Sequence, residues 1–541
     1  MSRKSLTAML LVLLFLALIT GLGMALTGDP LATFRTTLFI GSGDCNNCHS
    51  NLLDEEGQDI TFATLWRSSM MANSAKDPLW LAKVESEVLR TPSIQAAIED
   101  KCSICHMPMA NTQAKRDGTA VAIFGDGFIN PGNGLHVAAM DGISCSLCHQ
   151  IGSEGLGDPK TFSGHYPIDT ATMRGRLIYG RYPDPSVMRM AGYDAAYGLH
   201  MGDSDSCATC HTLYTTAYDK DGNVKGGPFP EQVPFLEWQN SSFSQGEVIS
   251  CQDCHLPPVT GAVPIARGRW APLRTDFGRH YFDGSNAFIL EMLRDNGNEL
   301  EVAASTKQFN QAIRRTEDQL AQGTALITVV NTDVSDTTLT VDLLVQNLTG
   351  HKFPTGIPIR RSWIHLTAVD GAGQTIFESG APLADGRISG NDADEDLATY
   401  EPHYREITAP DQVQIYETVL ADWNGDVTYT LLRATDFAKD NRLLPAGFDI
   451  DTAPLDVQVF GKATSDLNFI GGQDNISYAI PVEADSWPVT VTAELFYQPV
   501  AYSFVQDLAI DAAAFGEHFL GYNATADQSP DLISTEVTVI E

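Results

Sequence analysis

The stretch GISCSLCHQI, residues 142–151, places two cysteines three positions apart, with a histidine directly after the second. The same Cys-x-x-Cys-His pattern occurs five times in the chain of 541 residues and uses all ten cysteines. The five motifs are Cys45, Cys48 and His49; Cys102, Cys105 and His106; Cys145, Cys148 and His149; Cys207, Cys210 and His211; and Cys251, Cys254 and His255. Any fold of the first half of the chain must accommodate this repeated group.

The pattern is the attachment signature of c-type haem. Two thiols at this spacing reach the two vinyl groups of one porphyrin and form thioethers, and the adjacent histidine is then held under the iron as its proximal ligand. A zinc ribbon needs no histidine at that position, and a thioredoxin-like redox pair would not recur five times. We therefore expect five covalently attached haems, with iron bound by the motif histidines, and no disulfides.

The N-terminal segment has the pattern of an export signal. Arg3 and Lys4 precede an apolar run from about Leu6 to Ala25. A run of this length also suffices to span a bilayer if it is not removed. We expect residues 1–25 to be either a cleaved signal peptide or an N-terminal membrane anchor. Because haem is attached covalently outside the cytoplasmic membrane, we expect a periplasmic or extracellular, cell-surface protein of a prokaryote.

The composition is that of a folded protein with an uneven acidic charge. Hydrophobic residues make up 43% of the chain, and the formal net charge is −34. Residues 1–323 carry 25 Lys and Arg against 35 Asp and Glu, whereas residues 324–541 carry 9 against 33. Nucleic acid is excluded as an expected partner because phosphate binding needs a basic surface. A cationic protein partner, or solubility alone, fits the charge better.

The irons need further ligands, and eight histidines remain outside the motifs. His136 in GLHVAAM and His200 in GLHMGDS each lie shortly before a motif. His280 in FGRHYFD follows the last motif, and we expect it to open a helix. We interpret these three as distal haem ligands. For His165 in FSGHYPID, a ligand and a surface residue remain equal alternatives.

A methionine ligand is expected near the first motif. No free histidine lies between the first and second motifs, but WRSSMMANSAKDPLW, residues 66–80, contains Met70 and Met71. Methionines on a helix are usually core residues, yet methionine is also an axial ligand that raises the haem potential relative to bis-histidine ligation. We predict that Met71, or else its neighbour Met70, ligates one iron and gives that haem the highest potential.

The second half of the chain reads as β-sheet. A capping box of Ser305 and Gln308 predicts a helix that ends at Gly323. Strand-like alternation follows, separated by Gly, Asn and Asp turns, at 325–330, 338–348, 362–370, 374–380, 413–422, 426–434 and 487–498. We expect an α+β multidomain protein: a mostly helical and irregular pentahaem domain at 40–300, a connecting helix at 301–323 and an antiparallel, immunoglobulin-like β-sandwich at 324–541.

The motifs together resemble a known family. W-x-x-S-x-M at 66–71, GISCSLCHQI, F-L-E-W at 235–238 and G-H-K-F-P-T-G at 350–356 resemble exported multihaem, including pentahaem, c-type cytochromes, and are similar to tetrahaem nitrifier-type cytochromes. The resemblance covers residues 40–450 and implies electron transfer. It also implies that His351 of the GHKFPTG loop is a distal haem ligand. The second half would then hold the first by donating His351, whereas the alternative is a surface-loop histidine.

Other polar residues of the second half are weaker candidates. His403 in EPHYREI is a minor candidate ligand, His365 lies within an expected strand, and His518 lies in a late helical stretch. The acidic group Asp392, Asp394, Glu395 and Asp396 offers the oxygen ligands that calcium prefers, but we expect a solvated loop.

The leading functional hypothesis is a non-enzymatic electron carrier that relays electrons to a partner cytochrome or an external acceptor. The expected donors are redox proteins, either cytochromes or a membrane quinol-linked donor. The alternative is a reductase or oxidase of small nitrogen or sulfur compounds, which needs one haem with an open site. All five motifs keep their histidine, and the candidate ligands suffice for five irons, so the carrier is favoured. A third hypothesis is self-assembly as a filament subunit or surface scaffold.

Overall fold

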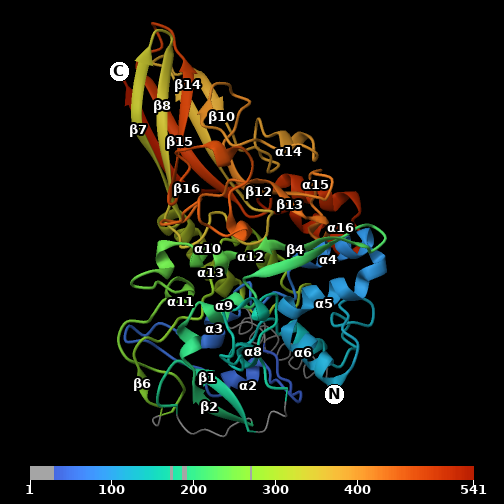
Figure 1. The fold of residues 1–541 in the computed structure, drawn as a ribbon. Coiled ribbons are helices and arrows are strands. Elements are labelled where there is room, and N and C mark those ends of the chain that lie inside the picture. Colours follow the sequence, from blue (N-terminus) through green and yellow to red (C-terminus); the bar gives the residue numbers. More distant parts are fainter. Residues whose placement is uncertain (1–29, 171–174, 186–191, 269–270) are drawn as a thin grey trace, which may run out of the picture.

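The computed structural model describes residues 30–170, 175–185, 192–268 and 271–541. The predicted signal or anchor at 1–25 lies outside these residues. Across the described segments, every helix is too short or too polar to cross a membrane. The chain forms two parts that lie one above the other in Figure 1. We call residues 30–300 the motif part and residues 324–541 the sandwich part.

The motif part consists of short helices and small two-stranded sheets joined by long irregular segments (Figure 1). Its helices are α2 (Ser42–Asn46), α3 (Phe62–Trp66), α4 (Pro78–Arg90), α5 (Gln95–His106), α6 (Pro108–Asp117), α7 (His136–Met140), α8 (Cys145–Cys148), α9 (Asp205–Ala208), α10 (Pro234–Gln239), α11 (Cys251–His255) and α12 (Ala287–Asp295). Its strands are β1 (Arg176–Gly180), β2 (Tyr193–Tyr197), β3 (Leu213–Tyr218), β4 (Val224–Gln232), β5 (Val263–Pro264) and β6 (Leu273–Arg274).

The connecting helix α13 (Thr306–Gly323) begins as the sequence predicts. The Ser305 side chain accepts a hydrogen bond from the backbone of Gln308, and the Gln308 side chain accepts one from the backbone of Ser305. This reciprocal capping box satisfies two otherwise unpaired backbone N–H groups at the start of the helix. Phe309, Ile313 and Leu320 lie on its buried face.

The sandwich part contains two sheets around one core. Its strands are β7 (Ala325–Ser335), β8 (Thr338–Asn347), β9 (Arg361–Val369), β10 (Thr375–Ser379), β11 (Glu406–Ile407), β12 (Ile415–Ala421), β13 (Asp436–Asp440), β14 (Gln473–Pro481), β15 (Val489–Gln498) and β16 (Asp531–Ile540). One sheet has the order β13-β12-β9-β15-β16 with β10 beside β9, and the other has the order β11-β14-β8-β7. Alternate residues of β8, β14 and β15 are buried and meet in a single cluster. The predicted α+β fold class is confirmed, whereas the immunoglobulin-like type stays a prediction.

Three sequence-based expectations differ from the structure. Residues 426–434 do not form a strand but a bridge and a short 3₁₀ turn at Leu431–Arg433. Strands β11, β13, β14 and β16 lie outside the expected strands. His280 does not open a helix, because α12 begins only at Ala287. The alternation of residues 426–434 serves packing against the motif part instead, where the backbone N–H of Leu431 donates to Glu87 Oε1 at 2.7 Å.

Two helices of the second half cover the motif part. The helices α15 (Tyr502–Ile510) and α16 (Ala514–Asn523) lie beside α4 in Figure 1. Arg90 of α4 pairs with Asp507 at 2.8 Å and with Asp511 at 2.6 Å. Glu85 accepts hydrogen bonds from the backbone N–H groups of Phe515 and Gly516 at the start of α16. The two parts therefore form one packed unit along α4.

Candidate haem-binding site

Each motif adopts the same local geometry. In the motifs of Cys45, Cys145 and Cys207, the histidine N–H donates to the carbonyl of the first cysteine, four residues earlier, at 3.0–3.1 Å. The second motif forms the last turn of α5, and the fifth motif makes up the whole of α11. Residues four apart in a helical turn lie on the same face. The first cysteine and the histidine of each motif therefore face the same space.

That space is one continuous cavity of about 1500 Å³ in the motif part. All ten cysteines and all five motif histidines border it. Single ligand pockets measure roughly 300–1000 Å³, and protein interiors seldom leave large voids. All ten cysteines are free thiols in the structure. Size, thiols and histidines fit several large groups held side by side.

The motif histidines are oriented for ligation through Nε2. The Nδ1 atoms of His49, His106, His149 and His255 hydrogen-bond to backbone carbonyls at 2.6–3.1 Å. A carbonyl accepts a proton and does not donate one, so Nδ1 carries the proton and Nε2 keeps its lone pair. Burial lowers the pKa of His106 and of His211 to about 4, so these rings are neutral at pH 7. Neutral imidazole is the form that binds iron.

Cysteines of different motifs touch. The side chains of Cys45 and Cys145 are hydrogen-bonded, as are those of Cys105 and Cys210 and those of Cys207 and Cys251. In a loaded protein these sulfurs would be thioethers. The contacts place the first motif beside the third, the second beside the fourth, and the fourth beside the fifth. Neighbours in space are therefore not always neighbours in the sequence.

His280 lies opposite the third motif. Its ring centre is 6.4 Å from that of His149, and the two rings are nearly parallel, at 10°. Two imidazoles on opposite faces of one metal ion, each about 2 Å from it, have ring centres roughly 6 Å apart. Nδ1 of His280 bonds to the carbonyl of Gly278 at 2.9 Å, so Nε2 is free. Burial lowers the pKa of His280 to about 4. This arrangement fits a pair of axial ligands.

His351 enters the cavity from the sandwich part. Its Nδ1 bonds to the carbonyl of Lys352 at 2.9 Å, and its ring borders the cavity on the side of His211 and His255. Burial lowers its pKa. The structure therefore brings this histidine of the second half to the motifs of the first, and its role as a haem ligand stays a prediction.

A buried ionic network fixes the loop that carries His351. Glu237 of α10 accepts hydrogen bonds from the Lys352 N–H at 3.1 Å, from the Thr355 hydroxyl at 2.5 Å and from Arg442 at 2.8 Å. Asp440 pairs with both Lys352 and Arg442 at 2.8 Å. The sequence alone assigns no role to Glu237, although this residue is the glutamate of the F-L-E-W motif. The signal that would have found it is a charged residue within an otherwise apolar run.

His200 also borders the cavity but uses the other nitrogen for its hydrogen bond. Its Nε2 bonds to the carbonyl of Ile151 at 2.9 Å, and the edge of its ring meets Tyr179. Nδ1 is therefore the nitrogen that keeps a lone pair. His200 is buried, with 7% of its surface exposed. The position fits a ligand on the cavity wall.

Met70 and Met71 border the same cavity. The carbonyl of Met71 accepts a hydrogen bond from Ile143 at 3.0 Å, and the indole of Trp66 donates to the Ile143 carbonyl at 3.0 Å. Gly142 has a φ of 61°, and a Cβ atom there would lie 2.7 Å from the Met71 carbonyl. Glycine is thus needed where this loop meets the third motif. That Met71, or else Met70, ligates one iron stays a prediction.

Two predicted candidates lie away from the cavity. His136, at the start of α7, is not part of the cavity lining among the described residues, and its Nε2 faces Glu301 at 4.0 Å. Its Nδ1 bonds to the Phe128 carbonyl at 2.9 Å. His165 is exposed and likewise absent from the described lining. Their ligand roles remain predictions that the cavity does not support.

The remaining histidines have other partners. His365 on β9 hydrogen-bonds to Glu494 and Glu378, and His518 lies in α16. His403 is buried in the sandwich part beside Asp466. The acidic group at 392–396 is not a wholly solvated loop, because Asp394 is buried and forms a pair of bonds with Arg361 at 2.7 and 3.0 Å. These residues serve the sandwich part and not the cavity.

Comparison with solved structures identifies the fold. The chain superposes on the crystal structure of a penta-haem cytochrome c552 from Thermochromatium tepidum with a TM-score of 0.52. The match covers 92% of this chain and 98% of that chain, at 17% sequence identity. The fold is that of a penta-haem cytochrome. Because so little of the chain is left out, the match extends over both the motif part and the sandwich part. Neither a protein-family model nor a curated protein sequence matches the chain.

Proposed function

We propose that the chain carries five covalently attached c-type haems and transfers single electrons among them. The observation that carries this proposal is the single cavity bordered by all five Cys-x-x-Cys-His motifs. The fold shared with a penta-haem cytochrome supports it. Bound haem supplies one-electron redox chemistry at a potential set by its axial ligands. The chain itself supplies the thioether cysteines, the axial ligands and one continuous cavity.

The contacts between motifs support transfer rather than isolated sites. The hydrogen-bonded cysteine pairs connect the first motif with the third, and the second, fourth and fifth with one another. Cys148 of the third motif also lies near Cys210 of the fourth. All five motifs thus belong to one connected series. An electron that enters at any motif can reach the others within the same chain.

The number of candidate ligands on the cavity wall supports an enzymatic alternative. Beyond the motif histidines, the described residues of the cavity wall offer His200, His280, His351, Met70 and Met71 as ligands. If one methionine ligates, four ligands serve five irons, because His136 and His165 lie elsewhere. The remaining iron would be open. A reductase or oxidase of small nitrogen or sulfur compounds needs such an open site.

The deciding experiment is low-temperature EPR of the oxidised protein, with iron and haem quantified per chain. The carrier predicts five haems with low-spin signals only. A stoichiometric high-spin signal would indicate an open iron and favour the enzyme, and turnover of nitrite, hydroxylamine and sulfite should then be measured. Fewer than five haems would contradict the proposal itself. Heating the sample under denaturing conditions provides the control, because covalently attached haem stays with the chain.

We further propose export to the periplasm or cell surface of a prokaryote, with cytochromes or a membrane quinol-linked protein as redox partners. The signal-like N-terminal segment and the cysteine motifs support this location. The net charge of −34 favours a cationic partner surface. Electron exchange with a cationic partner protein should therefore slow as the salt concentration is raised. Self-assembly into a filament would be seen as concentration-dependent growth in light scattering.

A further inference from the structure

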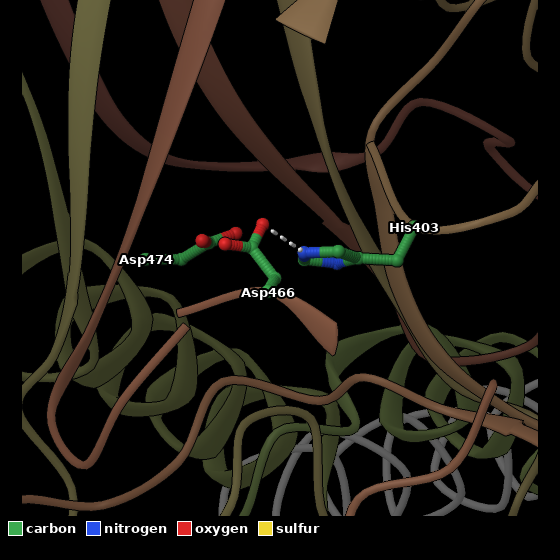
Figure 2. Close-up of side chains that lie close together, drawn as sticks. All are labelled: His403, Asp466 and Asp474. Carbon is green, nitrogen blue, oxygen red and sulfur yellow. Dashed lines mark hydrogen bonds and ion pairs between the residues drawn. The ribbon is translucent and has the colours of Figure 1, made fainter. Parts of the chain in front are cut away.

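The interior of the sandwich part contains a group of polar side chains that electron transfer does not use. His403, Asp466 and Asp474 each offer a donor atom, and these atoms lie within 4.8 Å of one another. Figure 2 shows the two carboxylates facing each other, with the His403 ring beside Asp466. All three residues are buried, and Asp474 is fully so. They come from the segment before β11, the segment before β14 and β14 itself.

Hydrogen bonding determines which nitrogen of His403 carries the proton. Nδ1 is within 2.9 Å of Gln414 Nε2 and 3.1 Å of Asn441 Nδ2. Neither amide can turn over, because Gln414 Oε1 accepts from the Tyr404 N–H, and Asn441 accepts from Glu417 and donates to the Ile415 carbonyl. Both amides therefore donate to Nδ1. Nε2 then carries the proton and donates to Asp466 Oδ2 at 3.2 Å. His403 positions Asp466 and has no lone pair left for a metal.

In the described part of the chain, the two carboxylates have a single cation within ion-pair distance, Arg405, whose side chain is largely exposed. Asp466 Oδ1 accepts from the Asn468 N–H at 3.1 Å, and its nearest cation, Arg405, is 64% exposed at 3.4 Å. Asp474 Oδ2 accepts from the Tyr416 hydroxyl at 2.8 Å. Asp474 Oδ1 is buried without a hydrogen-bond partner among the described residues, as is the side-chain oxygen of Asn468. Buried oxygens of this kind are normally paired, or they coordinate a metal ion.

We propose that Asp466 and Asp474 bind one Ca²⁺ ion in the interior of the sandwich part. Hard divalent cations take oxygen ligands, and Ca²⁺ accepts variable coordination geometry with water completing its shell. The buried amide oxygen of Asn468 is a third oxygen from the same loop. Zn²⁺ would require His403 Nε2, which carries a proton. The ion would hold the segment of Asp466 and Asn468 against β14.

The site also adjoins the network that carries His351. Asn441, which donates to His403, lies between Asp440 and Arg442, the two residues that pair with Lys352 and Glu237. Bound Ca²⁺ would therefore help to fix Asp440 and Arg442, the residues that hold the His351 loop in place. This role does not depend on electron transfer, since the site lies wholly within the sandwich part.

The test uses the haem-loaded, full-length protein. Calcium, zinc and iron are measured per chain by mass spectrometry before and after dialysis against EGTA, with iron as the internal count. Thermal unfolding is followed by far-UV circular dichroism in EGTA and with CaCl₂, MgCl₂ or ZnCl₂ added back. We expect about one calcium per chain and an unfolding midpoint raised by on the order of 5 °C at 100-fold excess over Kd.

Variants distinguish this site from other acidic surfaces. Asp474→Asn keeps the shape and one acceptor for Tyr416, and it should abolish both calcium retention and the CaCl₂ response. Asp485→Asn, in an exposed turn, is the matched control and should retain both. If Asp474→Asn fails to fold, Asp466→Asn and the wild-type chelation measurement decide. Absence of calcium with no response to CaCl₂, or stoichiometric zinc instead, would overturn the proposal.

Discussion

The two parts of the molecule contain similar amounts of chain but obtain their interiors in different ways. The sandwich part buries alternate residues of two sheets in one large cluster. The described residues of the motif part have short helices, small apolar clusters, one larger cluster that they share with α13, α15 and α16, and a cavity of about 1500 Å³ bordered by the motifs. A chain segment with so little side-chain core needs covalent cofactors to fill it. Attached cofactors would fill the interior of the motif part, whereas alternate strand residues fill the interior of the sandwich part.

The largest expected effect comes from removing one attachment site. Cys145→Ala with Cys148→Ala should prevent haem attachment at the third motif, which contacts the first motif and His280. We expect one haem fewer per chain and loss of soluble, folded protein, measured by pyridine haemochrome and yield. Survival of four haems in a fully stable protein would break the comparison, because the motif part would then have a sufficient core of its own.

The next effect concerns the histidine that crosses between the parts. His351→Ala should change the ligation of one haem, because the ring reaches the cavity from the sandwich part. EPR of the oxidised protein should show one new high-spin or shifted signal, with the others unchanged. His365→Ala on β9, away from the cavity, is the matched control. An unchanged spectrum for His351→Ala would mean that the parts are joined by packing alone.

In contrast to His351→Ala, a core substitution in the sandwich part should lower the stability and leave the haem spectrum unchanged. Leu343 on β8 is fully buried in the large cluster. Leu343→Ala should destabilise the protein by roughly 2–5 kcal/mol, because it removes apolar contacts and leaves a cavity. Denaturant unfolding followed by far-UV circular dichroism measures this loss, while the haem spectrum before unfolding should stay as in the wild type. Altered haem spectra would show that the two interiors are coupled.

The ion pairs along α4 should contribute less to the free energy of unfolding than the buried Leu343 side chain does. Arg90→Ala leaves the partly buried Asp507 and Asp511 without their cation, at a cost of roughly 2–3 kcal/mol. Arg387→Ala removes exposed pairs with Asp385 and Glu395 and should leave the stability nearly unchanged, because solvent screens such pairs. Both values come from denaturant unfolding. Equal costs for the two variants would argue against α4 as the main contact between the parts.

The smallest effect is a pH dependence at the boundary. Burial, with Glu317 and Glu291 nearby, raises the pKa of Asp531 to about 7. A carboxyl with a raised folded-state pKa binds its proton more tightly when folded, so stability falls as pH rises from about 4 to 7. Asp531→Asn should flatten this fall and make the protein more stable than the wild type at pH 8. A steeper fall in the variant would contradict the assignment.

Much of the cavity was predictable, but its distal ligands were only partly so. The motifs, the capping box of α13 and the approach of His351 follow from local pattern or resemblance. His136 and His200 have similar contexts in the sequence, with Gly and Leu before each, yet only His200 borders the cavity. Likewise, residues 426–434 alternate like a strand but pack against α4, while β14 pairs with β8 over a long sequence separation. Such choices depend on long-range packing, which local alternation does not contain.

The sequence alone determined the attachment chemistry, because Cys-x-x-Cys-His is a local group whose reactive atoms lie within one helical turn. It also determined the change from motif part to sandwich part, through the strand period after Gly323. Only the tertiary structure decided which motifs touch, which histidines reach the cavity, and that Glu237 holds the His351 loop. The same holds for the proposed Ca²⁺ site, where His403 positions the ligand Asp466 although it lies 71 positions before the second ligand, Asp474. Contacts of that kind arise from the folding of distant segments onto one another.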